Sequence, residues 1–389
     1  MVAVWSYPWS LLSDDIDATC RELAEHGVTS VTAAAHYHSI RTLEPRSNGT
    51  LFKSYTGGCY FDPDLSTVDT PIDPPVHEVA GHTDPFQSIV AGADRHAIDV
   101  NAWLVCFHNS KLGSEYPQYR TQSVFGDRHD HAFCPSHPAV QRYFEGIARS
   151  LAGYDIESIN LESLGYPDAF HSHGTRFGHA KNHVVQGRPE ELLLSQCFCS
   201  ACRSRAENHP IDFDRAREVT QRIARTALQQ PTASVTSLEE LATQQPELKK
   251  LFDFRSSVID ELLGRLAAAS GDIALTYSAS DGLGRDPDDG WPSGVTLDQL
   301  HEHIDRIVAL CYTADSDLAR RRVQQYKERV DVPVDIGITL DPDLFETESE
   351  LRGFLADVAG FGDRIHVYNH ALMSETHLDW LDTVTARSV

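Results

Sequence analysis

Short apolar runs rich in β-branched residues alternate with amphipathic runs eight times along the 389-residue chain, and this alternation constrains the fold more than any other feature. The expected strands are residues 2–7, 28–38, 99–109, 157–163, 272–280, 306–314, 333–341 and 364–370. A helical pattern follows each strand, from residues 13–27 at the start to 375–387 at the end. Eight strand–helix units are the count of a closed parallel barrel, so the sequence predicts an α/β fold of the (β/α)8 TIM barrel type.

A doubly wound open sheet is the alternative architecture. It fits less well, because no G-x-G-x-x-G follows the first strand and because the chain continues to an eighth strand–helix unit. Long loops follow the second to fifth strands, and residues 164–271 read as a helical insertion with a metal loop after the fourth strand. We therefore expect one barrel domain over residues 1–389, with its loop length concentrated on the face that carries the active site of such barrels.

The composition argues against several classes of partner. The formal net charge is -24, with 57 acidic residues against 33 basic ones, and only six of the basic residues are lysine. A nucleic-acid backbone would be repelled, and an acidic, lysine-poor surface is typical of a halophilic protein. No apolar run approaches the roughly 20 residues of a membrane helix, and the N-terminus lacks the pattern of a signal peptide. We expect a cytoplasmic protein without a membrane partner, and a homo-oligomer is one option for its assembly.

The C-terminal ends of the expected strands carry aromatic, histidine and amide side chains. In a barrel these ends point at one pocket, and aromatic platforms with hydrogen-bonding groups suit a polar, ring-shaped ligand such as a small carbohydrate. The expected substrate-binding residues are Trp5, Tyr7, His36, His38, His108, Asn109, Tyr277, Tyr312, Tyr368 and Asn369. Two of them, His36 and His38, share one side of their strand. We expect them to hydrogen-bond the substrate, and a metal pair is the alternative.

Glu162 is the only acid at the C-terminal end of the fourth strand, and we expect it to be the proton donor. Partial burial at the rim of a barrel raises the pKa of a carboxyl toward the range of a general acid, whereas the alternative is a structural glutamate paired with an arginine. A glycosidase needs a second carboxylate, and a separation of about 5 Å predicts retention and a larger one inversion.

Asp341, at the end of the seventh strand, is the expected second carboxylate. The surrounding LDPDLFE equally predicts a turn at the start of a helix, capped by Asp341 or Asp343. Asp281 and Asp315 are the reserve candidates.

The stretch CFCSAC places Cys197, Cys199 and Cys202 in a C-x-C-x-x-C pattern that suits a tetrahedral zinc ion. The candidates for the fourth ligand are Cys134, His129, His131 and His137. The alternative is three unligated cysteines at the start of a helix. Four thiolates would make the zinc structural, because a catalytic zinc keeps an open position. Reduced thiols fit a cytosolic protein better than a disulfide framework does.

Three of these features together resemble the family 42 β-galactosidases of glycoside hydrolase clan A. They are CPSHPAVQRYF before the fourth strand, the glutamate at its end and CFCSAC after it, within residues 130–205. The resemblance implies a zinc ion held by Cys134, Cys197, Cys199 and Cys202, and it implies that Glu162 is the acid/base. The sequence departs from the clan pattern at Leu161, where the clan usually has asparagine, and at Asp341, where it has a nucleophilic glutamate. We expect the trimerisation domain of that family to be absent, because the eighth unit is the last one in the sequence.

Three functions are consistent with these patterns. The first is a glycoside hydrolase-like enzyme that cleaves a small glycoside or oligosaccharide with Glu162 and Asp341 and carries a structural Zn²⁺. The second is a metal-dependent sugar isomerase, epimerase or lyase, with Glu162 and histidines around a divalent ion. The candidate histidines are His36, His38, His108 and His370. The third is a carbohydrate-binding barrel without catalysis.

Overall fold

Eight parallel strands close into a ring, which confirms the predicted (β/α)8 barrel. The computed structural model describes residues 1–13, 15–170, 188–230, 237–279, 286–287 and 290–386. The ring consists of β1 (Val2–Ser6), β2 (Ser30–Tyr37), β6 (Asp99–Val105), β9 (Ser158–Glu162), β10 (Ala274–Ser278), β11 (Arg306–Leu310), β12 (Val334–Thr339) and β13 (Ile365–Tyr368). Because β1 pairs with β2 on one side and with β13 on the other, the sheet has no open edge within the ring.

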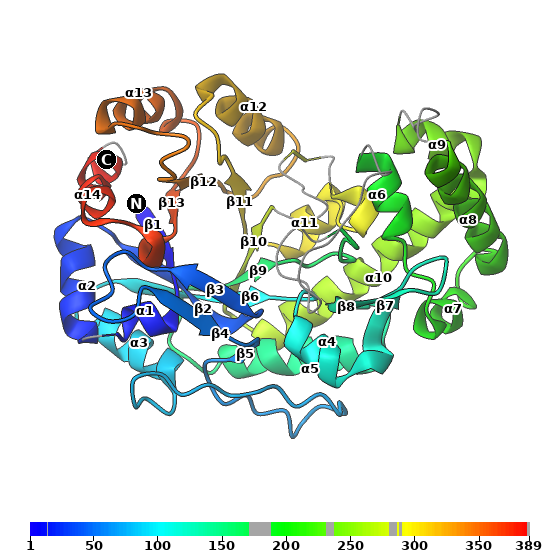
Figure 1. The fold of residues 1–389 in the computed structure, drawn as a ribbon, viewed down its shortest axis with the longest axis horizontal. Helices are drawn as coiled ribbons and strands as arrows, with labels where there is room; N and C mark the ends of the chain where they lie inside the picture. The colour runs from blue at the N-terminus through cyan, green and yellow to red at the C-terminus, as the bar shows by residue number, and fades with distance from the viewer. Residues whose placement is uncertain (14, 171–187, 231–236, 280–285, 288–289, 387–389) are drawn as a thin grey trace.

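Helices surround the ring, as Figure 1 shows. They are α2 (Ile16–Glu25), α3 (Pro85–Asp94), α5 (Pro138–Leu151), α10 (Pro246–Ser270), α11 (Leu297–His303), α12 (Ser316–Lys327), α13 (Glu348–Val358), α14 (Glu375–Asp379) and α15 (Leu381–Thr385). Their sequences explain their positions. In α5, the buried residues Val140, Phe144 and Ile147 recur at the spacing of one helix face. Helix α13 begins at a capping box in which Thr347 and Glu350 satisfy each other's backbone amides.

The segment between β9 and β10 adds helices outside the eight-fold plan. They are α6 (Arg188–Leu194), α7 (Ser200–Ala206), α8 (Phe213–Gln229) and α9 (Leu238–Gln244), and they gather on one side of the barrel (Figure 1). The last helix of the segment, α10, packs against α5 and α11. It therefore takes the place of the outer helix between β9 and β10, although the sequence pattern grouped it with the insertion.

Two loops that follow strands contain small sheets where the sequence predicted plain loops. After β2 comes a hairpin of β3 (Ile40–Leu43) and β4 (Phe52–Tyr55), then β5 (Gly58–Cys59), which pairs antiparallel with β2. After β6 comes a hairpin of β7 (Arg120–Gln122) and β8 (Arg128–Phe133). The remaining short helices are α1 (Pro8–Leu11), α4 (Ser110–Glu115), η1 (Pro117–Tyr119), η3 (Trp291–Ser293) and η4 (His370–Leu372).

Polar and charged side chains fill the barrel near the N-terminal ends of its strands. Asp335 is fully buried and accepts hydrogen bonds from Arg306 at 2.6 Å and from His366 at 2.8 Å. Burial opposes the charge of Asp335, but these two partners hold the pKa of its carboxyl below the ordinary value. A cavity of about 160 Å³ lies beside this group, lined in part by Asn101 and Thr276. The opposite end of the barrel is filled by aromatic rings.

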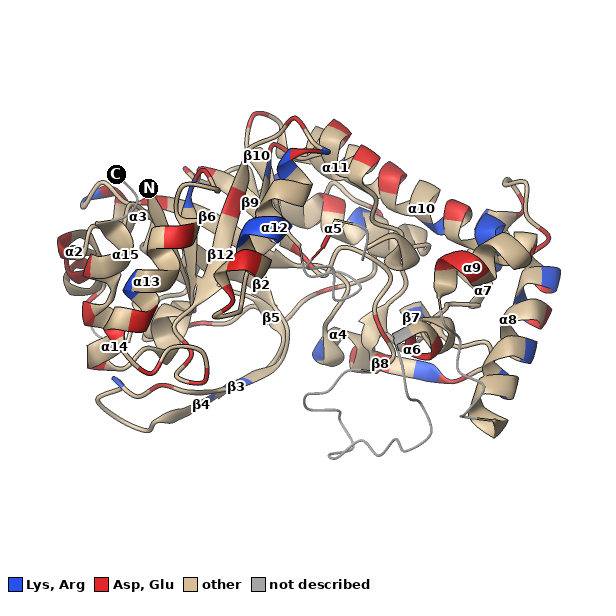
Figure 2. Cartoon of the chain, turned by 90° about the horizontal axis from the view of Figure 1, so that it is seen from above, with Lys and Arg blue, Asp and Glu red and all other residues tan. Residues whose placement is uncertain are grey.

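Acidic positions are spread over the outer helices and are not confined to one patch (Figure 2). Within the described part of the chain, every helix is too short or too polar to cross a membrane.

Candidate active site and four-cysteine group

Glu162 is the last residue of β9, at the C-terminal end of the barrel, and its side chain is half-buried. The neighbouring strand β6 carries Trp103, whose Nε1 donates a hydrogen bond to Oε2 of Glu162 at 2.6 Å. The indole is 2% exposed. Because a buried indole N–H needs an acceptor, this bond holds one oxygen of the carboxylate in place.

Three tyrosines from other strands lie beside Glu162. Tyr7 follows β1, Tyr37 ends β2 and Tyr368 ends β13, and the hydroxyls of Tyr7 and Tyr368 are 3.1 Å apart. Burial raises the pKa of all three phenols, and the nearby charge of Glu162 raises each pKa further. The phenols therefore stay protonated, so they act as hydrogen-bond donors and not as nucleophiles.

Exposure divides the ten predicted substrate-binding residues into two groups. The half-buried ones are His38, His108, Tyr312 and Tyr368. The buried ones are Trp5, Tyr7, His36, Asn109, Tyr277 and Asn369. A buried side chain reaches a ligand only after its neighbours move, so direct contact with a ligand is easier for the first group. In that group, the rings of His38 and His108 stack with their centroids 4.7 Å apart.

His36 does not share the surroundings of His38. Its ring lies edge-on against Tyr143 and Phe144 of α5, and its Nδ1 is 2.7 Å from the carbonyl oxygen of Val105. Burial lowers the pKa of His36 to about 4, so it is neutral. Strand β2 ends at Tyr37, so the alternation of sides on which the sequence argument relied does not extend to His38, and the pairing of β2 with β6 is already irregular between Ala34 and His36. The geometry thus gives His36 a packing role against the helix layer.

Two of the buried polar residues hold backbone turns. Oδ1 of Asn109 accepts the Leu112 amide at the start of α4 at 3.1 Å, and its Nδ2 donates to the Tyr37 carbonyl at 3.2 Å. Oδ1 of Asn369 accepts the amide of Ala371 at 3.0 Å. Asn109 thus uses both ends of its amide to hold loops at the barrel mouth, whereas Nδ2 of Asn369 is buried without a hydrogen-bond partner among the described residues.

His370, the other histidine considered for metal binding, forms a hydrogen-bonded group with Arg46 and Ser6. Arg46 Nη2 lies 2.7 Å from Nε2 of His370, and Ser6 Oγ lies 3.1 Å from Nδ1. Because a guanidinium only donates, Nε2 is the acceptor and Nδ1 carries the proton. Burial, with a contribution from Arg46, lowers the pKa of His370 to about 3.

Asp341 is exposed and lies in a turn after β12. Its Oδ1 accepts the backbone amide of Asp343 at 2.9 Å, which is the turn contact that LDPDLFE predicts. Its charge also acts on His377 of α14. Of the reserve acids, Asp315 caps α12 through the Leu318 amide at 3.0 Å, and Asp281 lies outside the described residues. The role of Asp341 as a second carboxylate stays a prediction.

The four cysteines that the sequence singled out come together. Cys134 precedes α5, and the other three precede or begin α7. The sulfur of Cys134 lies 3.5 Å from Cys202, 3.6 Å from Cys199 and 3.7 Å from Cys197, and all four sulfurs lie within 4.8 Å of one another. All four residues are buried. This group could bind a metal, and it takes its fourth member from Cys134 and not from a histidine.

Two neighbours hydrogen-bond to these sulfurs. The amide of Gln122 donates to Cys197 Sγ at 3.3 Å, and the thiol of Cys202 donates to Ser136 Oγ at 3.3 Å. Hydrogen bonds with the other three cysteines lower the pKa of Cys199, whereas burial raises the pKa of Cys134 and that of Cys202.

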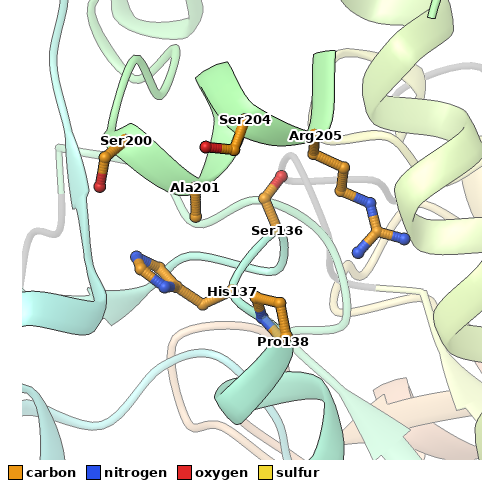
Figure 3. Close-up of a pocket in the computed structure, with 7 residues that line it drawn as sticks. All are labelled: Ser136, His137, Pro138, Ser200, Ala201, Ser204 and Arg205. Carbon is orange, nitrogen blue, oxygen red and sulfur yellow. The ribbon is translucent and has the colours of Figure 1, made fainter. Parts of the chain in front are cut away.

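A pocket of about 390 Å³ opens beside this group, between the starts of α5 and α7 (Figure 3). Its lining residues are Ser136, His137, Pro138, Ser200, Ala201, Ser204 and Arg205. Ser136 and His137 follow Cys134 in sequence, and Ser200 and Ala201 lie between Cys199 and Cys202. The pocket is thus formed by the two segments that carry the cysteines.

One other group of possible metal ligands occurs in the described ranges, formed by Asp260, Glu302 and His303 at the surface of α10 and α11. The histidines at the strand ends belong to neither group. The structure therefore offers no support for a histidine-bound ion at the barrel mouth within the ranges it describes.

Sequence reasoning did not assign a role to Trp103. The signal was available: Trp103 lies in the strand that neighbours the fourth strand in barrel order, and a buried indole requires an acceptor. Tyr37, which ends β2 beside Glu162, is likewise absent from the predicted substrate-binding residues.

The sequence matches no family model and no curated protein. Its structure is similar to several solved structures of low sequence identity. The catalytic domain of beta-amylase from Paenibacillus polymyxa has a TM-score of 0.56 at 11% identity, covering 100% of this chain and 98% of that one. The endo-1,4-beta-mannanase from Rhizomucor miehei has a TM-score of 0.52 at 10% identity, covering 98% and 92%.

The beta-galactosidase from the psychrophilic Marinomonas ef1 has a TM-score of 0.55 at 9% identity. The alignment covers 99% of this chain but 59% of the galactosidase, so the chain spans about three fifths of that protein. At these identities the likeness shows the fold alone.

Proposed function

We propose that the protein is a glycoside hydrolase-like enzyme that acts on a small glycoside or oligosaccharide, with Glu162 as the general acid/base. The observation that carries this proposal is the placement of Glu162, half-buried at the C-terminal end of β9 with Oε2 bound to the indole of Trp103. A carboxyl held in one orientation can transfer a proton in a defined direction. The same end of a barrel carries the active site in enzymes of this fold.

The side chains around Glu162 support a carbohydrate ligand. His38, His108, Tyr312 and Tyr368 are half-buried and combine ring faces with hydrogen-bonding groups. Such surfaces suit sugars, which present apolar faces and polar edges. The names of the three similar structures, an amylase, a mannanase and a galactosidase, agree with this class of substrate, and that agreement is an argument from fold analogy.

We infer that the four cysteines hold a structural Zn²⁺. Zinc–sulfur bonds of about 2.3 Å in a tetrahedron place the sulfurs about 3.8 Å apart. The distances of 3.5–3.7 Å from Cys134 Sγ to the other three sulfurs are close to this value. Four thiolates fill the coordination sphere, so the ion would supply folding free energy and no reaction chemistry.

Substitution of Glu162 tests the catalytic proposal. The Glu162→Gln variant keeps the size of the side chain and an acceptor oxygen for Trp103 but cannot cycle a proton. We expect turnover on aryl glycosides and oligosaccharides to fall by about 10²–10⁴-fold while calorimetry still detects ligand binding. Glu328→Gln, at an exposed helix end, is the matched control. Full activity of Glu162→Gln would remove Glu162 from the mechanism.

A carbohydrate-binding barrel without catalysis is the second candidate. It is favoured by one observation: Asp341, where the clan pattern has a nucleophile, is exposed and bonded to the turn amide of Asp343. This candidate predicts that the wild-type protein binds sugars in calorimetry but turns over no member of a glycoside panel.

A further inference from the structure

The segment that follows Glu162 is attached to the four-cysteine group. Tyr166 is buried, and its hydroxyl lies 2.6 Å from Oγ of Ser136. The same Ser136 Oγ lies 3.3 Å from the sulfur of Cys202. One short chain of contacts therefore links a cysteine of the group to a residue only four positions after Glu162.

Arg255 of α10 makes a second connection through Tyr166. Its guanidinium carbon lies 4.4 Å from the centre of the Tyr166 ring, and its Nη2 donates to the carbonyl oxygen of Cys197 at 3.2 Å. Arg255 is 1% exposed, so both contacts are shielded from water, where a cation over an aromatic ring is worth most. Tyr166 is thus held between the two cysteine-bearing segments, by Ser136 on one and through Arg255 on the other.

Asp168 provides an independent attachment two residues further on. Its Oδ1 accepts a hydrogen bond from Ser195 Oγ at 2.8 Å, and Ser195 lies two positions before Cys197. Its backbone oxygen is 2.8 Å from Nε2 of His131, which precedes Cys134 by three positions. The loop therefore contacts both segments of the group at Asp168 as well as at Tyr166.

The short stretch between Glu162 and Tyr166 has little freedom to absorb a displacement. The carbonyls of Glu162 and Ser163 accept the amides of Cys106 and Phe107 at 2.8 and 3.1 Å. Ser163 has a φ of 52°, which few L-residues adopt. At Gly165, a Cβ atom would lie 2.4 Å from Oγ of Ser293, so the backbone passes close to η3. A shift of Tyr166 is therefore transmitted toward Glu162.

We propose that metal binding at the four-cysteine group positions Glu162, and that Tyr166 is the positioning residue through which it does so. Three sulfurs lie 3.5–3.7 Å from that of Cys134, so a metal ion bound by all four would join residues 134–137 to residues 195–202. Loss of the metal would remove this connection, and Tyr166 and Asp168, which contact these segments, would be held less firmly. This inference depends on the proposed function only for the statement that the placement of Glu162 matters for catalysis.

The indole N–H of Trp103 reports the position of Glu162 without any activity assay. The chain has five tryptophans, so ¹⁵N-indole labelling gives five signals, and the Trp103→Phe variant identifies the one that donates to Glu162. We expect this signal to shift when zinc is removed with a chelator and to return when zinc is added. We also expect amide exchange in residues 163–168 to become roughly tenfold faster in the metal-free protein.

Tyr166→Phe separates the role of Tyr166 from that of the metal. It should keep one zinc per chain while shifting the Trp103 signal and raising exchange in residues 163–168. Tyr154→Phe is the matched control, because it also loses a phenol hydroxyl that takes part in a hydrogen bond, here one donated to Asp84 at 2.8 Å. Ser136→Ala is the milder variant if Tyr166→Phe does not fold, and it should give the same changes.

An unchanged Trp103 signal and unchanged exchange on zinc removal would overturn the inference, whatever the activity of Glu162→Gln. Changes in the control Tyr154→Phe equal to those in Tyr166→Phe would also overturn it, because the effect would then be general loosening. Conversely, full activity of Glu162→Gln would remove the proposed function and leave the coupling measured here intact.

Discussion

The hydrogen-bonded group of His370, Arg46 and Ser6 predicts that the free energy of unfolding falls by a defined amount in mild acid. The imidazole is 3% exposed and accepts from Arg46, so protonating it in the folded state would place two cations side by side. Its folded-state pKa is about 3, against about 6.5 for an unperturbed histidine. Because the folded-state pKa is the lower one, the stability is fully present above pH 6.5 and is lost as the pH falls toward 3.

The magnitude follows from proton linkage. Between pH 7.5 and pH 5.5 the imidazole of the unfolded chain takes up most of one proton, while His370 in the folded protein stays neutral. Linkage over this interval removes about 1.4 kcal/mol from the free energy of unfolding for this one residue.

A His370→Gln variant isolates this contribution. At pH 7.5 the variant should be less stable than wild type, because Arg46 and Ser6 lose their partner. At pH 5.5 the difference in the free energy of unfolding should be about 1.4 kcal/mol smaller. The reason is that proton uptake by the unfolded chain at position 370 lowers the stability of the wild type but not that of the variant. Urea denaturation at constant ionic strength measures both differences. A difference for His370→Gln that does not change with pH would refute the reasoning.

Three further substitutions test the site. Trp103→Phe keeps an aromatic ring but removes the N–H that donates to Glu162, so turnover should fall about tenfold or more while the fold is unchanged. Equal turnover would show that this hydrogen bond is unimportant for the reaction. Asp341→Asn keeps an oxygen for the Asp343 amide, so we expect activity to fall through loss of charge alone, and full activity would leave Asp341 with the turn role only. Cys199→Ser should reduce bound zinc below one per chain and lower the midpoint of thermal unfolding by several degrees, as metal analysis and calorimetry would show; full occupancy would mean that Cys199 is not a ligand.

The features that the sequence predicted correctly are those written in local patterns. Strand and helix periodicity act over a few residues, so the eight units could be read from the chain and counted. The cysteine group was recognisable because C-x-C-x-x-C is rare by chance, and the structure brings Cys134 to the other three. The position of Glu162 followed from the end of its strand.

The features that sequence reasoning missed depend on contacts between distant segments. The bond from Trp103 to Glu162 needs the pairing register of β6 with β9, which no local pattern contains. His36 faces α5, and the pairing of β2 with β6 is irregular just before it, which no local pattern reveals. The hairpins after β2 and β6 are short and partly exposed, so their alternation of apolar and polar residues was too weak to distinguish from a loop.

The charged group at the base of the barrel has a consequence for engineering. Asp335 is fully buried and accepts hydrogen bonds from both Arg306 and His366, so replacing either partner alone leaves the buried carboxylate without one of its donors. Removing one partner of such a buried ion pair typically costs about 3–5 kcal/mol, whereas a well-packed aliphatic set of the same volume is often equally stable or more so. We therefore expect that exchanging the three residues together would preserve the stability of the barrel better than exchanging them one at a time.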